Sequence, residues 1–228
     1  MSTTASKYSG LDHQPDQGRP GGPLVRMLRP LLRAQFGQPS GLFGEIAGRL
    51  MARDKSNAER TRWTLALLEI KPTDRVMEIG FGPGLAIELA SQSASSGLIV
   101  GLDHSEVMLR HAARRNRRAV RDGRVQLQLS SAEDLPAFEL PFDKIFSINS
   151  IHFWKDPLQS ITRLRSMLKP GGVLALTIQP RSRNATPEST KVIGEELMQK
   201  LRLAGFTDCR LELRLIKPMV VACAIGRK

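Results

Sequence analysis

The chain has 228 residues and a mass of 25.2 kDa, a length typical of one domain with an appended arm. Hydrophobic residues make up 41% and charged residues 25%, a balance that excludes a wholly disordered chain, a collagen-like fibre and a coiled coil. The 34 Lys and Arg residues against 22 Asp and Glu give a formal net charge of +12. This excess favours polyanionic partners such as RNA, DNA or an acidic membrane surface.

The composition also bears on compartment and metal content. The apolar stretches of the sequence fall short of the roughly 18 residues that a membrane-spanning helix needs, and the polar N-terminus does not read as a signal peptide. We therefore expect a soluble, cytoplasmic protein in which Cys209 and Cys223 are reduced thiols. His13, His104 and His111 do not form a metal-binding pattern, so we expect no metal.

Residues 1–41 are predicted to form a flexible arm, because five prolines and repeated glycines disfavour a packed core. Between Pro23 and Gly37, apolar residues recur at helical spacing among arginines, which predicts a short basic amphipathic segment interrupted at Pro30. Two interpretations stay open for this segment. It forms either a helix packed on the body of the protein, or a lid or membrane-surface contact.

From residue 42 to residue 228, helices and strands are predicted to alternate in one domain. After helices at 42–53 and 57–69, strand-like runs occur at 75–80, 98–103, 125–130, 144–149 and 173–178, with helices at 84–95, 105–120 and 157–168 between them. This alternation requires crossover connections and predicts a mostly parallel sheet with helices on both faces. After a helix near 188–203, the runs 209–216 and 219–226 are so close that they predict an antiparallel hairpin at the sheet edge.

The most informative motif is a glycine-rich turn after the first predicted strand. Gly80, Gly82 and Gly84 lie there, and glycines let the backbone bend sharply and approach a ligand. The spacing differs from the dinucleotide-binding G-x-G-x-x-G, since Leu85 occupies the position of the third glycine. Asp103 ends the second strand, where a carboxylate can accept hydrogen bonds from ribose hydroxyls or cap the next helix.

The order of four motifs resembles the class I S-adenosylmethionine-dependent methyltransferases of the small-molecule type. The motifs E-x-G-x-G-x-G, D-x-S-x-x-M-L, A-E-D-L-P and L-x-P-G-G are found here at 78–84, 103–109, 132–136 and 168–172. The resemblance spans residues 42–228. It implies an α/β fold with a doubly wound, mostly parallel seven-stranded sheet, the Rossmann-like methyltransferase fold, and S-adenosylmethionine as cofactor.

The resemblance also implies which residues contact this cofactor. The three glycines would surround its methionine part, Asp103 would bind the ribose, and Met108 would contact the adenine. Ser131 stands where relatives often carry an Asp for the adenine amino group, and backbone groups of Ala132 and Glu133 are expected to contribute. The other residues expected at the cofactor are Glu78, His104 and Asn149.

The segment 149–157 follows the fourth strand, where members of the family place groups near the transferable methyl. It lacks the D/N-P-P-Y/F sequence typical of enzymes that methylate exocyclic amino nitrogens. Cys209 and Cys223 lie far from it, which disfavours methylation at C5 of cytosine. His152 resembles the base in the His-Asp-Trp-x-Asp segment of some O-methyltransferases, with Phe153 in place of the first Asp. A histidine is suited to taking a proton from an acceptor; the alternative is that His152 packs beside the cofactor.

We therefore expect a metal-independent enzyme that methylates an O, N, S or C atom of a small, apolar or amphipathic molecule. Phe43, Met51 and Trp63, in the helices within 42–69, are expected to give the acceptor site apolar walls. Two alternatives stay open: an RNA methyltransferase, and a non-catalytic protein that binds S-adenosylmethionine or nucleic acid. The run 110–124 bears on the RNA alternative, because its seven arginines are opposed by Asp122 alone; a solvated helix face also explains it.

Overall fold

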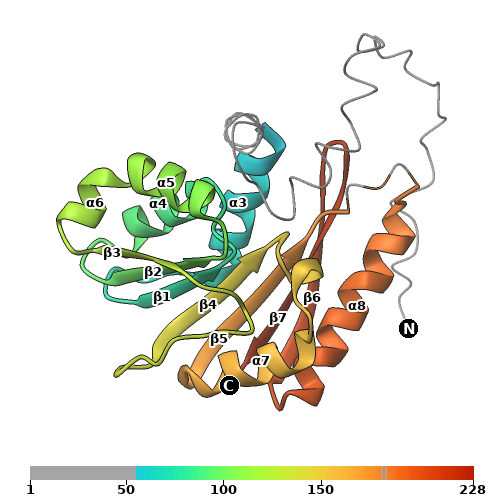
Figure 1. Ribbon diagram of the computed structural model, residues 1–228. Coiled ribbons are helices and arrows are strands. Elements are labelled where there is room, and N and C mark those ends of the chain that lie inside the picture. The colour runs from blue at the N-terminus through green and yellow to red at the C-terminus, as the bar shows by residue number, and fades with distance from the viewer. Residues whose placement is uncertain (1–54, 181, 183) are drawn as a thin grey trace, which may run out of the picture.

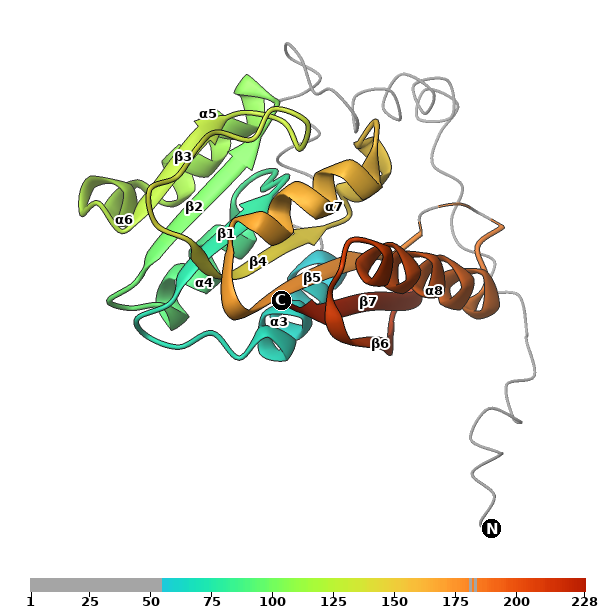
Figure 2. The same cartoon turned by 90° about the horizontal axis from the view of Figure 1, so that it is seen from below.

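The computed structural model describes residues 55–180, 182 and 184–228, in which a seven-stranded sheet carries helices on both faces (Figures 1 and 2). The predicted arm at 1–41 and the predicted helix at 42–53, with Phe43 and Met51, lie outside the described residues.

The elements follow the predicted alternation of strands and helices. The strands are β1 (Arg75–Ile79), β2 (Leu98–Asp103), β3 (Val125–Leu129), β4 (Phe142–Ile148), β5 (Leu168–Ile178), β6 (Thr207–Ile216) and β7 (Met219–Arg227). The helices are α3 (Lys55–Leu68), α4 (Leu85–Ser93), α5 (Glu106–Arg115), α6 (Arg117–Arg121), α7 (Pro157–Ser166) and α8 (Pro187–Leu203), with a 3-10 turn η1 (Ile151–Phe153).

The strand order places a ligand-binding crevice at the middle of the sheet. The order is β3-β2-β1-β4-β5-β7-β6, and β1 pairs in parallel with β2 on one side and with β4 on the other. The chain reverses its direction of travel across the sheet between β3 and β4. In such sheets, ligands bind outside the carboxyl ends of the strands at this reversal. The predicted hairpin is confirmed, because β7 pairs antiparallel with both β5 and β6 at one edge.

Successive side chains of β1 point to opposite faces of the sheet, and each face has its own apolar core. Met77 and Ile79 belong to a cluster with Leu164 of α7 and Leu201 of α8. Val76 belongs to the other cluster, whose helical members are Leu65, Leu68, Ala86, Ile87, Ala90, Val107, Met108, Ala112 and Ala119. Figure 2 shows α7 and α8 on the face opposite α3 and α4. Burial of apolar side chains from both sides fixes the strands and therefore the positions of their carboxyl ends.

The predicted single helix at 105–120 is wrong, because the chain forms two helices that meet at Asn116. The Asn116 backbone, with φ −99° and ψ 16°, departs from helical geometry. Its side-chain Nδ2 donates to the carbonyl oxygens of Ala112 at 2.9 Å and Gly84 at 3.1 Å. The side chain thus links the end of α5 to the glycine-rich turn. Among the helices that the structure describes, none is long and apolar enough to cross a membrane.

Candidate functional site

The glycine-rich turn between β1 and α4 adopts a backbone that favours glycine. Gly80, Gly82 and Gly84 have φ angles of 78°, 50° and 81°, in the left-handed region. A Cβ on Gly80 would collide with Ser150, and a Cβ on Gly84 would lie 2.7 Å from Cβ of Ala112. At Gly82, in contrast, a Cβ would meet nothing within 4 Å. Gly80 and Gly84 therefore serve close packing, and Gly82 presents open backbone.

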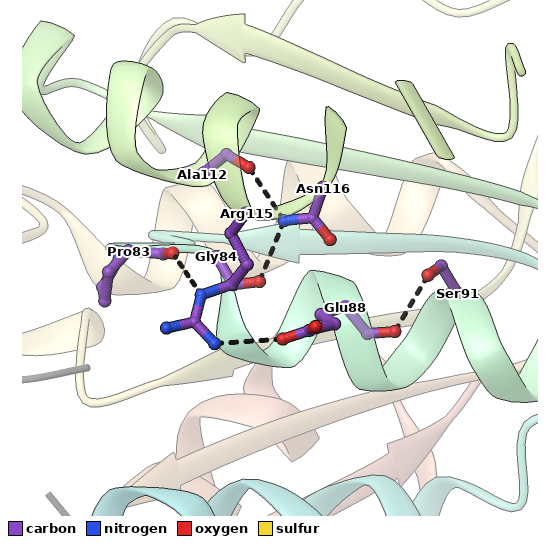
Figure 3. Close-up of polar contacts among 7 residues, drawn as sticks. All are labelled: Pro83, Gly84, Glu88, Ser91, Ala112, Arg115 and Asn116. Carbon is purple, nitrogen blue, oxygen red and sulfur yellow. Dashed lines mark hydrogen bonds and ion pairs between the residues drawn. The ribbon is translucent and has the colours of Figure 1, made fainter. Parts of the chain in front are cut away.

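Side chains at the C-terminal end of α5 bind this turn (Figure 3). Arg115 donates from Nε to the carbonyl oxygen of Pro83 at 3.1 Å, and its NH1 lies 3.0 Å from a carboxylate oxygen of Glu88. Asn116 adds the bond to Gly84 described above. Part of the arginine-rich run 110–124 therefore stabilises the turn, in addition to forming a solvated face.

Asp103 at the end of β2 organises the other side of the crevice. One carboxylate oxygen accepts from the Gly82 amide at 2.8 Å, and the other accepts from the Ser105 amide at 2.9 Å. Burial raises the pKa of Asp103 above its ordinary value, although these amides and His104 oppose the shift. The hydroxyl of Ser105 accepts from the Met108 amide and caps α5. Asp103 is thus not required as the side-chain cap.

Glu78 is a buried carboxyl group at the end of β1. Its side chain is part of the same crevice, and Oε2 has no hydrogen-bond partner among the described residues. Burial and, to a smaller extent, the charge of Asp103 raise the pKa of Glu78 well above its ordinary value. A buried oxygen of this kind favours a ligand that brings a hydrogen-bond donor.

The strand ends enclose a cavity of about 850 Å³. Its lining includes His152 and the predicted cofactor residues Glu78, Gly80, Gly82, Asp103, His104, Met108, Ser131, Ala132, Glu133 and Asn149. Gly84 is the exception, since it packs against α5 and does not line the cavity. The predicted wall residue Trp63 is also absent from the lining and packs against the apolar core instead.

The loop after β3 forms the wall next to β2. Ala132 of this loop and Met108 of α5 are buried apolar residues in this wall. Glu133 accepts from the Lys155 amide at 2.7 Å. Burial alone would raise the pKa of Glu133, but hydrogen bonds from Lys155 and Ser131 outweigh it and lower the pKa. The side chain of Glu133 thus connects this loop to the segment after β4.

The segment after β4 brings His152 to the cavity. Asn149 has a left-handed φ of 55°, which turns the chain out of β4 into η1. His152 is exposed at the cavity wall, and its ring centroid lies 3.9 Å from that of Phe153. Trp154 is buried and donates from Nε1 to Ser150 at 3.0 Å. Asp156 caps α7 by accepting from the Gln159 amide.

Four polar residues in the cavity wall belong to none of the sequence motifs. Asn57, Arg60 and Thr61 of α3, together with Gln179 after β5, lie in its wall. An arginine near the start of a helix that also carries the exposed Arg62 is typical of a solvent-facing residue. Only the packing of α3 over the end of β5 reveals that Arg60 is buried.

Other candidate chemistry is limited. Within the part of the chain that the structure describes, no group of three or more His, Cys, Asp or Glu residues could hold a metal ion. Cys209 and Cys223 are free thiols, and burial raises the pKa of Cys223 to about 12.

Comparisons with known proteins agree with this site. A family described as a methyltransferase domain matches residues 76–172. The chain is 36% identical over 183 residues to the uncharacterized methyltransferase YdaC of Bacillus subtilis, a match that covers 80% of this chain and 98% of YdaC. It is 29% identical over 143 residues to the 27-O-demethylrifamycin SV methyltransferase of Amycolatopsis mediterranei, covering 60% of this chain and 52% of that protein.

A solved structure shows the same fold at lower identity. The N-methyltransferase NodS of Bradyrhizobium japonicum, in complex with S-adenosyl-L-homocysteine, superimposes with a TM-score of 0.60 at 17% identity. The match covers 78% of this chain and 90% of NodS.

Proposed function

Since the chain belongs to the class I S-adenosylmethionine-dependent methyltransferases, we propose that it methylates a small, apolar or amphipathic molecule and that His152 takes the acceptor's proton. S-adenosylmethionine is the cofactor. When bound, it would supply a methyl group activated by a positively charged sulfur, and this sulfur is the leaving group when a nucleophile attacks the methyl carbon.

The residues of the cavity fit this cofactor. The orphaned Oε2 of Glu78 can accept a hydrogen bond from a ligand donor, and the open backbone at Gly82 allows close approach. The Asp103 carboxylate retains acceptor capacity for ribose hydroxyls beside its two amide bonds. Met108 and Ala132 offer an apolar slot for the adenine, with Ser131, Glu133 and His104 around it.

The observation that carries the proposed role of His152 is its exposure at the cavity wall after β4. β4 is the direct neighbour of β1, which carries the glycine-rich turn. An exposed imidazole in this wall can be reached by an acceptor that enters the cavity, and it can hold the proton that the attacking atom loses. The Phe153 ring packs beside the imidazole.

The cavity has the size of a small-molecule site, and it would hold the cofactor as well as the reacting part of the acceptor. Its volume of about 850 Å³ falls in the range of roughly 300–1,000 Å³ typical of small-molecule sites. By its name, the Amycolatopsis relative acts on a rifamycin, which is a small molecule. Positioning the acceptor against the methyl group and excluding water would then supply much of the catalysis.

The test measures S-adenosylhomocysteine formation with a panel of phenol, amine and thiol acceptors. We expect H152A to lower kcat at least about a hundredfold, with S-adenosylhomocysteine affinity within twofold of the parent protein. H111A is the matched control, because His111 does not line the cavity. An H152A variant that retains most of its turnover would assign His152 to packing.

A further inference from the structure

Arg60 is a buried arginine whose role no motif explains. It lies in α3, the residue is 2% exposed, and it forms part of the cavity wall. Removing a guanidinium group from water costs free energy that hydrogen bonds and an anionic ligand can offset. A buried arginine at a ligand cavity therefore indicates a recognition role.

Neutral amides orient this guanidinium. NH1 donates to Oε1 of Gln179, and NH2 donates to Oδ1 of Asn57 at 2.7 Å. Gln179 is itself fixed, because its Nε2 donates to the carbonyl oxygens of Ile216 at 2.6 Å and Met219 at 3.0 Å. Its backbone amide donates to Oδ1 of Asn149 at 2.7 Å. Arg60 is thus held by groups from α3, the end of β5 and, through Gln179, the β6–β7 hairpin.

The position of Arg60 relative to Asp103 indicates which part of the cofactor it meets. Asp103 ends β2, whereas Gln179 follows β5, and the intervening strands are β1 and β4. Neighbouring strands lie about 4.8 Å apart, so Arg60 belongs to the end of the cavity away from the proposed ribose and adenine contacts. The part of S-adenosylmethionine that extends away from its nucleoside is the amino-acid end, which carries a carboxylate.

We propose that Arg60 binds the carboxylate of S-adenosylmethionine and that Gln179 is a positioning residue that holds the guanidinium in place for it. A planar guanidinium matches a carboxylate with two parallel N–H donors. The inference rests on the identity of the cofactor and is independent of the acceptor and of the role of His152.

Two ligands that differ at the amino-acid end provide the test. S-adenosylhomocysteine carries the carboxylate, whereas 5′-methylthioadenosine lacks the whole amino-acid end. By calorimetry we expect R60M to weaken S-adenosylhomocysteine binding about ten- to a hundredfold and to leave 5′-methylthioadenosine binding within twofold. R60K should recover part of the loss, because it restores the charge without the planar pair of donors.

A control variant in the same helix and a variant of the positioning residue complete the design. R62M changes an exposed arginine of the same helix and should bind both ligands as the parent protein does. Q179L should weaken S-adenosylhomocysteine binding less than R60M does, again with 5′-methylthioadenosine unaffected. If R60M binds S-adenosylhomocysteine within twofold of the parent protein, or loses both ligands in parallel, the proposal is overturned. Should R60M not fold, R60K and Q179L decide by the same comparison of the two ligands.

Discussion

Asp103 connects the fold of the glycine-rich turn to the proposed ribose contact. Its carboxylate accepts from two backbone amides, one of them in the turn. We expect D103A to weaken S-adenosylhomocysteine binding about ten- to a hundredfold, because a charge-assisted hydrogen bond to the ligand is lost and the turn is loosened. D134A, at an exposed position that does not line the cavity, is the control for calorimetry. Equal affinities of the two variants would contradict the ribose assignment.

Glu78 predicts a pH dependence of stability in the ligand-free protein. Its pKa lies well above the ordinary value of 4.5 because of burial, so the folded state binds this proton more tightly than the unfolded chain. Above the ordinary value the unfolded chain releases the proton first, and stability falls as the pH rises towards the raised pKa.

The E78Q variant removes this titration. We expect the melting temperature of E78Q relative to the parent protein to increase between pH 5 and pH 8, by about 2–4 °C for each kcal/mol of penalty. A difference that stays constant across this pH range would show that Glu78 does not titrate in the folded protein as described.

Single residues also mark where prediction from sequence succeeds. Glu78, Gly82 and Asp103 could be placed at one site because they end or follow parallel strands, whose carboxyl ends meet at one edge. Arg60 could not, since its burial depends on how α3 packs over β5, which helical periodicity does not specify. Gly84 carries a packing role that its motif position does not distinguish from ligand contact.

At the scale of elements, the alternation of strands and helices was sufficient to predict a mostly parallel sheet, and the closeness of the last two strand-like runs was sufficient to predict the terminal hairpin. The break between α5 and α6 was not predictable, because Asn116 lies in an arginine-rich run with ordinary helical spacing. Its side chain instead donates to the Gly84 carbonyl of a turn 32 residues away, which also accepts from the Glu88 amide, and a long-range contact of this kind leaves no local signal.

The Asn116 junction predicts a measurable loss of stability. N116A removes the donor shared by the Gly84 and Ala112 carbonyls, and we expect a decrease of about 1–3 kcal/mol in the free energy of unfolding. N116D should be at least as damaging, because its carboxylate would face the same carbonyl oxygens. Urea denaturation measures both, with N184A at an exposed position as control. A loss below about 0.5 kcal/mol for N116A would exclude this junction as a stabilising contact.

At the scale of the whole molecule, the exposed arginines of α6 lie away from the cavity. Met108 near the start of α5 lines the cavity, and α5 leads from there to α6 beside β3, one of the two outer strands of the sheet (Figure 1). We therefore expect R117Q/R118Q/R121Q to keep kcat and KM of methyl transfer within about twofold, because charges so remote do not orient an acceptor.

The counterpart of the triple arginine variant is a deletion of residues 1–36, which include the predicted basic amphipathic segment. We expect this deletion to raise the KM for the acceptor or to abolish activity. The opposite pattern, with activity lost in the triple variant and kept in the deletion, would favour an RNA acceptor. RNA binding would then weaken steeply with added salt.

Gln179 donates to the carbonyls on both sides of the β6–β7 turn. These bonds couple the stability of the hairpin to the binding of a ligand by Arg60. If ligand binding stabilises the guanidinium that Gln179 holds, the same free energy opposes separation of the hairpin from β5, since coupling between two sites is reciprocal. Backbone amides of β6 and β7 near residues 213–222 should therefore exchange with deuterium more slowly when S-adenosylhomocysteine is bound. The edge of the sheet farthest from the proposed adenine contacts would thus report that the amino-acid end is occupied.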